Sequence, residues 1–561
     1  MPLDNYAIAD QFSLLSKLMD IHGENSFKSK SYSVAAFNIE KITTPLHEIS
    51  PDKLFTLKGI GESTGKKIIE ILDTGKLLAL EDMLLKTPPG ILDLLNIKGL
   101  GPKKISTIWK EMGIESVGEL LYACNENRLT LYKGFGEKTQ KSVQENIEFF
   151  LRHVGSYLYA QIESYAHQLL AGLANAFGDD LIEITGDFRR QNTIISKLEF
   201  VTTKSIEFIG DFFSQQNFVV EEVNQEMIAV KGPENILLVF YIATKDNFYY
   251  KLLETSSAPE FYEALQKENG WAATNKVDSE NEIFKSIHFN FVPAYLRDTT
   301  AFIERAKQKD FSDIIQVSDI KGIIHNHSNW SDGVNTVEEM AKTCMAQGFE
   351  YLVISDHSKT AAYAKGLQEE RIREQHLYID ELNAKLHPFK IFKSIESDIL
   401  NDGSLDYSNE VLATFDLVIG SVHQNLSMPE DKAMMRLLNA IRNPYTTILG
   451  HMTGRLLLSR KGYPVDHREV IKACVENNVV IELNAHPRRL DIDWSFIDDA
   501  IAQGAIISID PDAHSIDGFH DVKYGVLAAQ KGGLTKDKNL SSYSLAEFEK
   551  FLSDRRIAKK I

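Results

Sequence analysis

The sequence predicts a protein of several domains: a helical N-terminal region, a mixed α/β middle region and a C-terminal parallel β/α barrel. Three observations support this fold class. A glycine-containing turn signal repeats three times within residues 1–150, and helical and β-type runs alternate irregularly in residues 151–302. Seven short runs rich in Ile and Val, each followed by polar side chains, occur after residue 319. A chain of 561 residues is long enough for three or four domains.

The composition is typical of a soluble globular protein, with 43% hydrophobic and 25% charged residues. No run of 18 apolar residues occurs, so we expect no membrane span. The N-terminus lacks the basic and apolar segments of a secretory signal. Cys124, Cys344 and Cys474 are far apart and form neither a disulfide nor a zinc-site spacing. These features predict a cytoplasmic location.

The net charge of −18 argues against binding of nucleic acid through overall charge. Any contact with DNA must therefore depend on local basic loops.

The glycine signal of the N-terminal region has the form apolar-x-Gly-apolar-Gly, with lysines just beyond it. Its three copies contain Gly59, Gly61 and Lys66; Gly99, Gly101, Lys103 and Lys104; and Gly134, Gly136 and Lys138. Two glycines remove Cβ obstruction, and the following helix offers free N–H groups at its positive end. The pattern therefore predicts close approach of a phosphate. These segments resemble helix-hairpin-helix motifs, and the resemblance implies contacts with the DNA backbone that do not read the base sequence. The alternative is that these glycines only separate helices.

The seven apolar runs of the C-terminal region each lead into polar side chains of the types that bind metal ions. The residues that follow them are His325 and His327; Asp356 and His357; Glu396; His423; His451; Asn484 and His486; and Asp512 and His514. Such runs are typical of buried parallel strands. In a parallel barrel the carboxyl ends of the strands form one face, where catalytic groups collect. The sequence therefore predicts a single shared site.

The chain as a whole resembles bacterial family X DNA polymerases that carry a C-terminal polymerase-and-histidinol-phosphatase (PHP) domain. The resemblance rests on the segment 23–28 with Tyr32, on the motif Gly186-Asp187-Phe188-Arg189-Arg190, on the hairpins and on the histidine-rich barrel. It implies a lyase-like helical domain with the first helix-hairpin-helix at 1–90, a fingers-like hairpin region at 91–150, a palm-like nucleotidyltransferase domain at 151–235, a thumb-like domain at 236–302, a linker at 303–319 and a distorted (β/α)7 TIM-like PHP barrel at 320–561.

The polymerase site departs from the family pattern where its chemistry needs carboxylates. Nucleotidyl transfer uses two divalent cations, which three aspartates hold in this family. By resemblance, Lys197 and Glu199 stand at two of the aspartate positions and Val239 at the third. The phosphate-contacting serine of the family is replaced by Asp187. We therefore expect a degenerate nucleotide site, made of Gly186, Asp187, Arg189, Arg190, Lys197, Glu199 and Val239. The alternative is that the strands are misaligned and the carboxylates lie elsewhere.

The N-terminal domain raises the question of lyase chemistry, which needs a lysine amine to form a Schiff base. By resemblance, Lys67 stands at the position of that nucleophile, and Lys28 and Tyr32 would bind a 5′-phosphate. The alternative is that Lys67 is a solvated lysine or one that contacts the DNA backbone.

The resemblance also supplies the ligand set of the barrel. It implies nine metal ligands, His325, His327, Asp332, His357, Glu396, His423, His451, Asp512 and His514. It groups them around three cations: His325, His327, Glu396 and Asp512; then Glu396, His423 and His451; then Asp332, His357 and His514. A mixed imidazole and carboxylate set suits Mn²⁺, Zn²⁺ or Fe²⁺.

Glu396 and Asp512 are the expected catalytic carboxylates of this set. Arg455 and Arg489 follow barrel strands and are candidate phosphate clamps. Either arginine could instead form a structural ion pair.

These features favour a metal-dependent phosphoesterase that acts on gapped, nicked or 3′-ended duplex DNA. We expect a monomeric 3′–5′ exonuclease or 3′-end processing enzyme of DNA repair, in the cytoplasm or nucleoid, with polymerase activity lost. Three alternatives stay open: a gap-filling polymerase with a proofreading exonuclease, a DNA-end scaffold without catalysis, and a phosphatase of small molecules.

Overall fold

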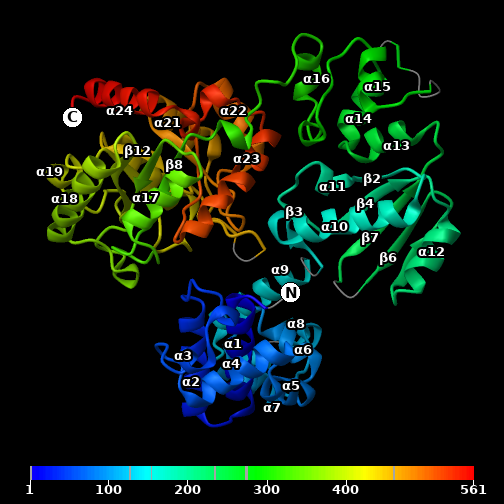
Figure 1. Ribbon diagram of the computed structural model, residues 1–561, viewed down its shortest axis with the longest axis horizontal. Coiled ribbons are helices and arrows are strands. Elements are labelled where there is room, and N and C mark those ends of the chain that lie inside the picture. Colours follow the sequence, from blue (N-terminus) through cyan, green and yellow to red (C-terminus); the bar gives the residue numbers. More distant parts are fainter. Residues whose placement is uncertain are drawn as a thin grey trace. The chain divides into compact units, whose positions relative to one another are not determined.

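The computed structural model describes residues 3–125, 128–152, 155–232, 235–268, 270–271, 276–458 and 461–561. The chain divides into two compact units, Met1–Val154 and Gly155–Ile561 (Figure 1). Within the described ranges, no helix combines the length and the apolar content that crossing a bilayer requires.

The described part of the first unit is helical. Its elements are α1 (Asn5–His22), α2 (Ser26–Ile39), η1 (Leu46–Glu48), α3 (Pro51–Leu54), α4 (Glu62–Thr74), α5 (Leu78–Leu85), α6 (Pro89–Leu94), α7 (Pro102–Lys110), α8 (Val117–Asn125), η2 (Arg128–Leu131) and α9 (Glu137–Arg152). Local signals fix the ends of α1: Asp4 accepts a hydrogen bond from the Ala7 N–H, and Gly23 ends the helix at φ 78°. One apolar core joins helices of this unit, with Phe12, Ile68 and Ile105 fully buried.

The second unit begins with a five-stranded sheet in the order β2-β4-β7-β6-β5. Its elements are β1 (Tyr157–Leu158), α10 (Tyr159–Phe177), β2 (Ile182–Thr185), α11 (Gly186–Arg189), β3 (Ile194–Ile195), β4 (Lys197–Thr202), α12 (Ile206–Ser214), β5 (Val219–Val223), β6 (Met227–Lys231) and β7 (Leu237–Ile242). β7 pairs along its whole length with β4 in parallel and with β6 in antiparallel orientation. The expected boundary between residues 235 and 236 is therefore wrong, because it would cut β7 from its own sheet.

A helical subdomain follows this sheet. It contains α13 (Phe248–Thr255), α14 (Pro259–Gln266), α15 (Glu280–Ser286), η3 (Ala294–Leu296) and α16 (Ala301–Ala306). Its apolar core includes Ile303, Phe311 and Ile314, which lie in the segment 303–319. This segment also contains η4 (Val317–Asp319). The expectation of a simple linker is therefore wrong. The segment is polar in overall composition, but its few apolar side chains are buried in the core of the helical subdomain.

The barrel consists of seven parallel strands whose spatial order follows the chain from β8 to β14. The strands are β8 (Gly322–Asn326), β9 (Tyr351–Ile354), β10 (Lys390–Asp398), β11 (Leu417–Ser421), β12 (Thr446–Leu449), β13 (Val480–Asn484) and β14 (Ile507–Asp510). A bridge between Asn326 and Ala513 links the first strand to the segment after the last. The predicted seven-stranded, TIM-like barrel is confirmed.

Helices connect these strands, as β/α units require. They are α17 (Val337–Ala346), η5 (Ala362–Ala364), α18 (Glu369–Leu386), α19 (Asn409–Leu412), α20 (Glu430–Arg442), α21 (His467–Glu476), η6 (Trp494–Phe496) and α22 (Ile497–Ala502). After β14, the last strand, come η7 (Ile516–Asp521), α23 (Val522–Lys531), η8 (Lys536–Lys538), η9 (Leu540–Ser542) and α24 (Leu545–Lys559).

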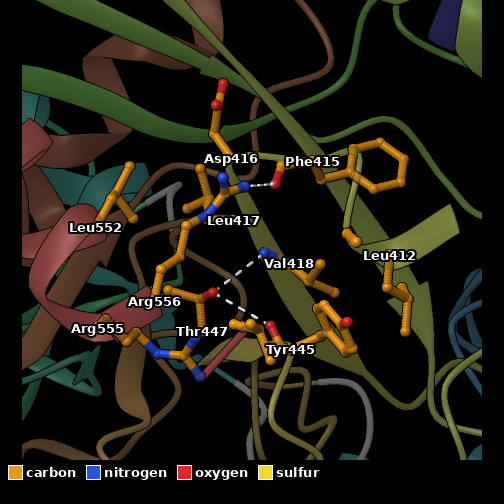
Figure 2. A pocket seen from close by; sticks show the side chains of 12 residues that line it. Leu412, Phe415, Asp416, Leu417, Val418, Tyr445, Thr447, Leu552, Arg555 and Arg556 are labelled. Atoms are coloured by element: carbon orange, nitrogen blue, oxygen red, sulfur yellow. Dashed lines mark hydrogen bonds between the residues drawn. The ribbon is translucent and has the colours of Figure 1, made fainter. Parts of the chain in front are cut away.

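The last helix, α24, covers the end of the barrel at which the strands begin. Arg556 donates to the carbonyl of Phe415, just before β11, and Arg555 donates to the carbonyl of Thr446 at the start of β12. A small cavity of about 40 Å³ lies beside these arginines and is lined also by Leu417 and Leu552. Figure 2 shows the side chains around it. Because this end is filled by side chains, the opposite end is the one available for a site.

Candidate metal centre

The expected ligands gather where the barrel strands end. His325 lies within β8 and Glu396 within β10, whereas His451 and Asp512 lie two residues beyond β12 and β14. His325 and Asp512 have φ angles of 60° and 52°, a left-handed conformation that is uncommon for residues other than glycine. Such backbone conformations cluster at functional sites, where the surrounding structure enforces them.

Glu396 is at the centre of the cluster. One of its carboxylate oxygens, Oε1, lies 3.0 Å from His451 Nε2, 3.1 Å from His423 Nε2 and 3.3 Å from His325 Nε2. The other oxygen, Oε2, lies 2.9 Å from His357 Nδ1. A single buried carboxylate therefore faces imidazoles from several barrel strands and can bridge cations.

Eight of the nine residues, all except His451, fall into overlapping groups in which one ligand atom from each member lies within 4.8 Å of the others. These groups are His325, His327 and Asp512; His357, Glu396 and His423; and His327, Asp332, His357 and His514. The first and third reproduce most of the grouping that the resemblance implies. In the second, His357 takes the place expected for His451, which contacts Glu396 directly.

Charges within the cluster set the protonation of its histidines. Burial, with the neighbouring His514 and His357, lowers the pKa of His327 to about 3, so its imidazole is neutral near pH 7. Burial also lowers the pKa of His423, but Glu396 and Asp398 outweigh this effect and raise it to about 10. His423 must therefore release a proton before Nε2 can bind a cation.

Two buried carboxylates that the sequence analysis missed hold ligand histidines from behind. Glu482 bonds Nδ1 of His325, and Asp398 bonds Nδ1 of His423. Each contact orients the opposite nitrogen, Nε2, toward Glu396. The available signal was an acidic residue at the end of β10 and another inside the apolar strand β13, where a charge is costly unless it is paired.

The cluster fits divalent cations. His325 Nε2 and Glu396 Oε2 are fully buried and form no hydrogen bond of normal geometry within the described part of the chain. Both point into a group of nitrogen and carboxylate donors, which is the ligand set that first-row transition metals prefer. At the open side, the side chains of Asp332 and His514 are 33% and 42% exposed, so a substrate can reach the cluster.

The two candidate phosphate clamps differ. The guanidinium of Arg455 donates to the carbonyls of Arg489 and Leu490 and to Asp493, the last at 2.5 Å. These bonds favour the alternative of a structural ion pair for Arg455, and its role as a phosphate clamp stays a prediction. Arg489 instead lies with Nε 3.6 Å from Oδ2 of Asp512, at the edge of the cluster. His486, two residues beyond β13, is only partly buried and is in none of the ligand groups found among the described residues.

The residues expected at the family's carboxylate positions lie together on the five-stranded, palm-like sheet. Glu199 of β4 and Val239 of β7 are partners in the parallel pair. Glu199 forms an ion pair with Lys197, with Nζ 2.7 Å from Oε1, and accepts a hydrogen bond from Tyr241 at 2.8 Å. A Cβ on Gly186 would approach Glu199 Oε2 to 1.9 Å. Glu199 is therefore already bound by protein groups.

The two arginines of this site, Arg189 and Arg190, also form ion pairs with acidic side chains of the protein. Arg189 pairs with Glu280 at 2.5 Å, and Glu280 pairs with the fully buried Arg297 at 2.6 Å. Arg190 pairs with both Asp187 and Asp298. In addition, Lys531 of α23 donates to Asp298 and, at 2.7 Å, to the carbonyl of Arg190. These cations contact acidic groups of the protein itself.

The three glycine hairpins show two different uses of glycine. Gly59, Gly99 and Gly134 have φ angles of 79°, 86° and 96°, which only glycine adopts readily. Gly61 and Gly101 have φ angles of −83° and −88°, which any residue can adopt. A Cβ atom added at Gly61, Gly101 or Gly136 would meet no atom within 4 Å. The second glycine of each hairpin stands directly before a helix, α4, α7 or α9. Neither packing nor conformation requires it, whereas close approach of a phosphate would.

The lysines near these hairpins differ in exposure. Lys66, Lys103 and Lys138 are exposed, whereas Lys104 is partly buried and donates to the carbonyl of Gly99 at 3.1 Å. Lys67 on α4 is partly buried. Its role as a lyase nucleophile stays a prediction.

Comparisons with known proteins agree with this arrangement. A helix-hairpin-helix domain model matches residues 3–77, a SAM-like helix-hairpin-helix tandem model matches residues 91–147, and a PHP domain model matches residues 324–486. Relatives of the barrel include a probable phosphatase of Acetivibrio thermocellus, 30% identical over 29% of this chain and 64% of its own length. A second is a probable phosphatase of Thermoanaerobacter sp., 24% identical over 41% of this chain and 94% of its own length.

A third relative extends over nearly the whole chain. The Bacillus subtilis protein named DNA polymerase/3′-5′ exonuclease PolX is 31% identical across 95% of this chain and 96% of its own length. The hairpins, the palm-like sheet and the PHP barrel follow in one chain, and this chain belongs to the family X DNA polymerases that carry a C-terminal PHP domain.

Proposed function

We propose that this chain is a metal-dependent phosphoesterase that removes nucleotides from, or repairs, the 3′ end of DNA, and that it no longer synthesises DNA. One observation carries the proposal. The nine expected ligands lie together at one end of the barrel, whereas the charged groups of the nucleotide site are bonded to one another.

The chemistry follows from the charges of the cluster. When bound, clustered divalent cations lower the pKa of a water molecule and neutralise phosphate oxygens as negative charge builds. The histidines and Glu396 hold those cations, with Glu482 and Asp398 fixing two of the imidazole rings. Arg489 is only 20% exposed and borders Asp512, where a short movement would bring it to a non-bridging phosphate oxygen.

The N-terminal unit supplies the support for DNA as the substrate. Exposed lysines flank hairpin glycines whose Cβ positions face open space. Backbone contacts of this kind hold a duplex without reading its sequence. The relative from Bacillus subtilis is named for 3′-5′ exonuclease activity, which favours a 3′ end over other positions.

The palm-like sheet supports the loss of synthesis. A catalytic cation would meet the ammonium group of Lys197 at one expected carboxylate position and an uncharged Val239 at another. Nucleotide phosphates would have to displace Glu280, Asp187 and Asp298 from the two arginines. Both contacts oppose binding of a nucleotide with its metal ions.

The test uses the full chain with gapped, nicked and 3′-recessed duplexes in Mn²⁺, with and without deoxynucleotides. We expect release of mononucleotides from the 3′ end, abolished by His325→Ala, and no primer extension. Failure to cleave any DNA end with Mn²⁺, Zn²⁺ or Fe²⁺ would refute the nuclease, and extension abolished by Glu199→Ala would refute the loss of synthesis.

A second candidate comes from the barrel relatives, which are named as probable phosphatases. The same panel therefore includes a 3′-phosphate end and a free phosphate monoester. Faster phosphate release from the free monoester than from any DNA end would favour a small-molecule phosphatase. Two helix-hairpin-helix matches in the same chain favour DNA.

A further inference from the structure

We propose that Glu482 and Asp398 are positioning residues that set the affinities of two different cation positions independently of each other. Neither is one of the nine expected ligands. Both are buried, with Glu482 0% and Asp398 3% exposed, and both contact the rear nitrogen of a ligand histidine.

Glu482 contacts the ligand group of His325, His327 and Asp512 by two routes, and a third route holds the backbone of His451. Its Oε1 bonds Nδ1 of His325, and its Oε2 accepts the backbone N–H of His451 at 2.5 Å. Oε2 also accepts from Asn484 Nδ2 at 3.3 Å, and the same amide donates to Asp512 Oδ2 at 3.1 Å. One carboxylate therefore fixes the ring of one ligand, the backbone of a second and, through an amide, the carboxylate of a third.

Asp398 acts on a different group. Its Oδ1 bonds Nδ1 of His423, a member of the group with His357 and Glu396. Its Oδ2 accepts from the hydroxyl of Thr360 at 2.7 Å, which holds the carboxylate in place. Because Asp398 contacts no member of the His325 group in the described hydrogen bonds, its effect is confined to the second cation position.

The physical reason is general to metal-binding histidines. A carboxylate behind the imidazole fixes the tautomer and the ring orientation and makes the binding nitrogen more basic, and its removal typically weakens metal affinity about 10- to 100-fold. Glutamine in place of Glu482 keeps the volume but has one NH₂ group in place of an oxygen. Either one of the three contacts then fails, or His325 accepts from this NH₂ through Nδ1 and carries its proton on Nε2, where it blocks cation binding.

The test measures metal binding to apoprotein prepared by chelation, without DNA, so that it does not depend on the proposed nuclease. Mn²⁺ is titrated into wild type, Glu482→Gln and Asp398→Asn, with free Mn²⁺ followed by electron paramagnetic resonance. We expect each variant to lose one class of bound ion by about 10- to 100-fold in affinity and to keep another. The absorption spectrum of bound Co²⁺ should differ from that of wild type in both variants, and the two variants should differ from each other.

Glu280→Gln is the matched control, because Glu280 is equally buried and ion-paired but lies in the helical subdomain before the barrel. It should bind Mn²⁺ as wild type does even where its stability falls. If Glu482→Gln fails to fold, Asn484→Ala tests the same network and should weaken the same class of ion. The proposal is overturned if Glu482→Gln, or Asn484→Ala in its place, binds Mn²⁺ with the same affinities as wild type. Identical losses in the Glu482 and Asp398 variants overturn the claim of independence.

Discussion

Replacing Glu396 by Gln is the sharpest test of the metal centre, because this carboxylate belongs to more ligand contacts than any other group described in the cluster. Its two oxygens lie within 3.3 Å of nitrogens from His325, His357, His423 and His451. Glutamine keeps the size of the side chain and removes the charge that bridges two cation positions.

The magnitude follows from those contacts. Loss of a supporting carboxylate behind a ligand costs about 10- to 100-fold, and loss of a direct ligand should cost at least as much at each of two positions. We therefore expect a fall of about 10²- to 10⁴-fold in exonuclease kcat/KM, or roughly 3–5 kcal/mol in the activation barrier. The control is Glu549→Gln, a half-exposed partner of Lys390 at the other end of the barrel. Steady-state release of a labelled 3′ nucleotide measures the effect, and a fall below 10-fold at saturating Mn²⁺ would refute the bridging role.

Four further predictions test other parts of the molecule. Arg489→Ala should lower kcat by about 10²- to 10³-fold, whereas Arg455→Ala should mainly lower the thermal unfolding temperature; equal losses of kcat in both would contradict the distinction. Gly101→Val should weaken DNA binding in a fluorescence anisotropy titration while costing only about 1 kcal/mol of stability, because its Cβ meets open space and valine is a poorer N-cap of α7 than glycine. Burial raises the pKa of Glu280, but Arg297 and Arg189 outweigh it and hold the pKa below 4.5. Its contribution to stability is therefore present above pH 4.5 and lost as pH falls through the lower folded pKa. Glu280→Gln should cost about 3–5 kcal/mol near neutral pH in urea unfolding, and a cost that persists undiminished at pH 2 would contradict this linkage. Chelation should destabilise the barrel by about 2.7 kcal/mol for each site held at a cation concentration 100-fold above its Kd, and an unchanged calorimetric transition would count against a bound cation.

The strand ends of the barrel were predictable because the relevant physics is local. A run of Ile and Val marks a buried parallel strand, and the carboxyl ends of such strands share one face. The positions of His325, Glu396 and Asp512 at one end of the barrel follow from that rule. Their grouping around particular cations does not, since it came from the resemblance to a family, and the structure exchanges His357 for His451 in one group.

The supporting residues depend on contacts that no local pattern reveals. Glu482 is 157 positions from His325 along the chain, and nothing near it in the sequence marks the histidine as its partner. The role of Arg455 could not be predicted either, because an arginine after a strand suits both a phosphate clamp and an ion pair. The carbonyls that favour the ion pair belong to residues 34 and 35 positions away along the chain. The boundary at residue 235 failed because membership of a sheet is decided by pairing with distant strands.

The ion pairs at the palm-like site also bear on how such a site could evolve. Arg189 now contacts the helical subdomain through Glu280, and Arg190 shares Asp298 with Lys531 of the barrel. Under the proposed loss of synthesis, residues at the expected nucleotide-binding positions are part of the framework of the second unit. Replacing only Lys197 by Asp would leave Glu199 without its cation and both arginines still paired. Nucleotide binding would then require several simultaneous replacements, each of which breaks an ion pair of the framework.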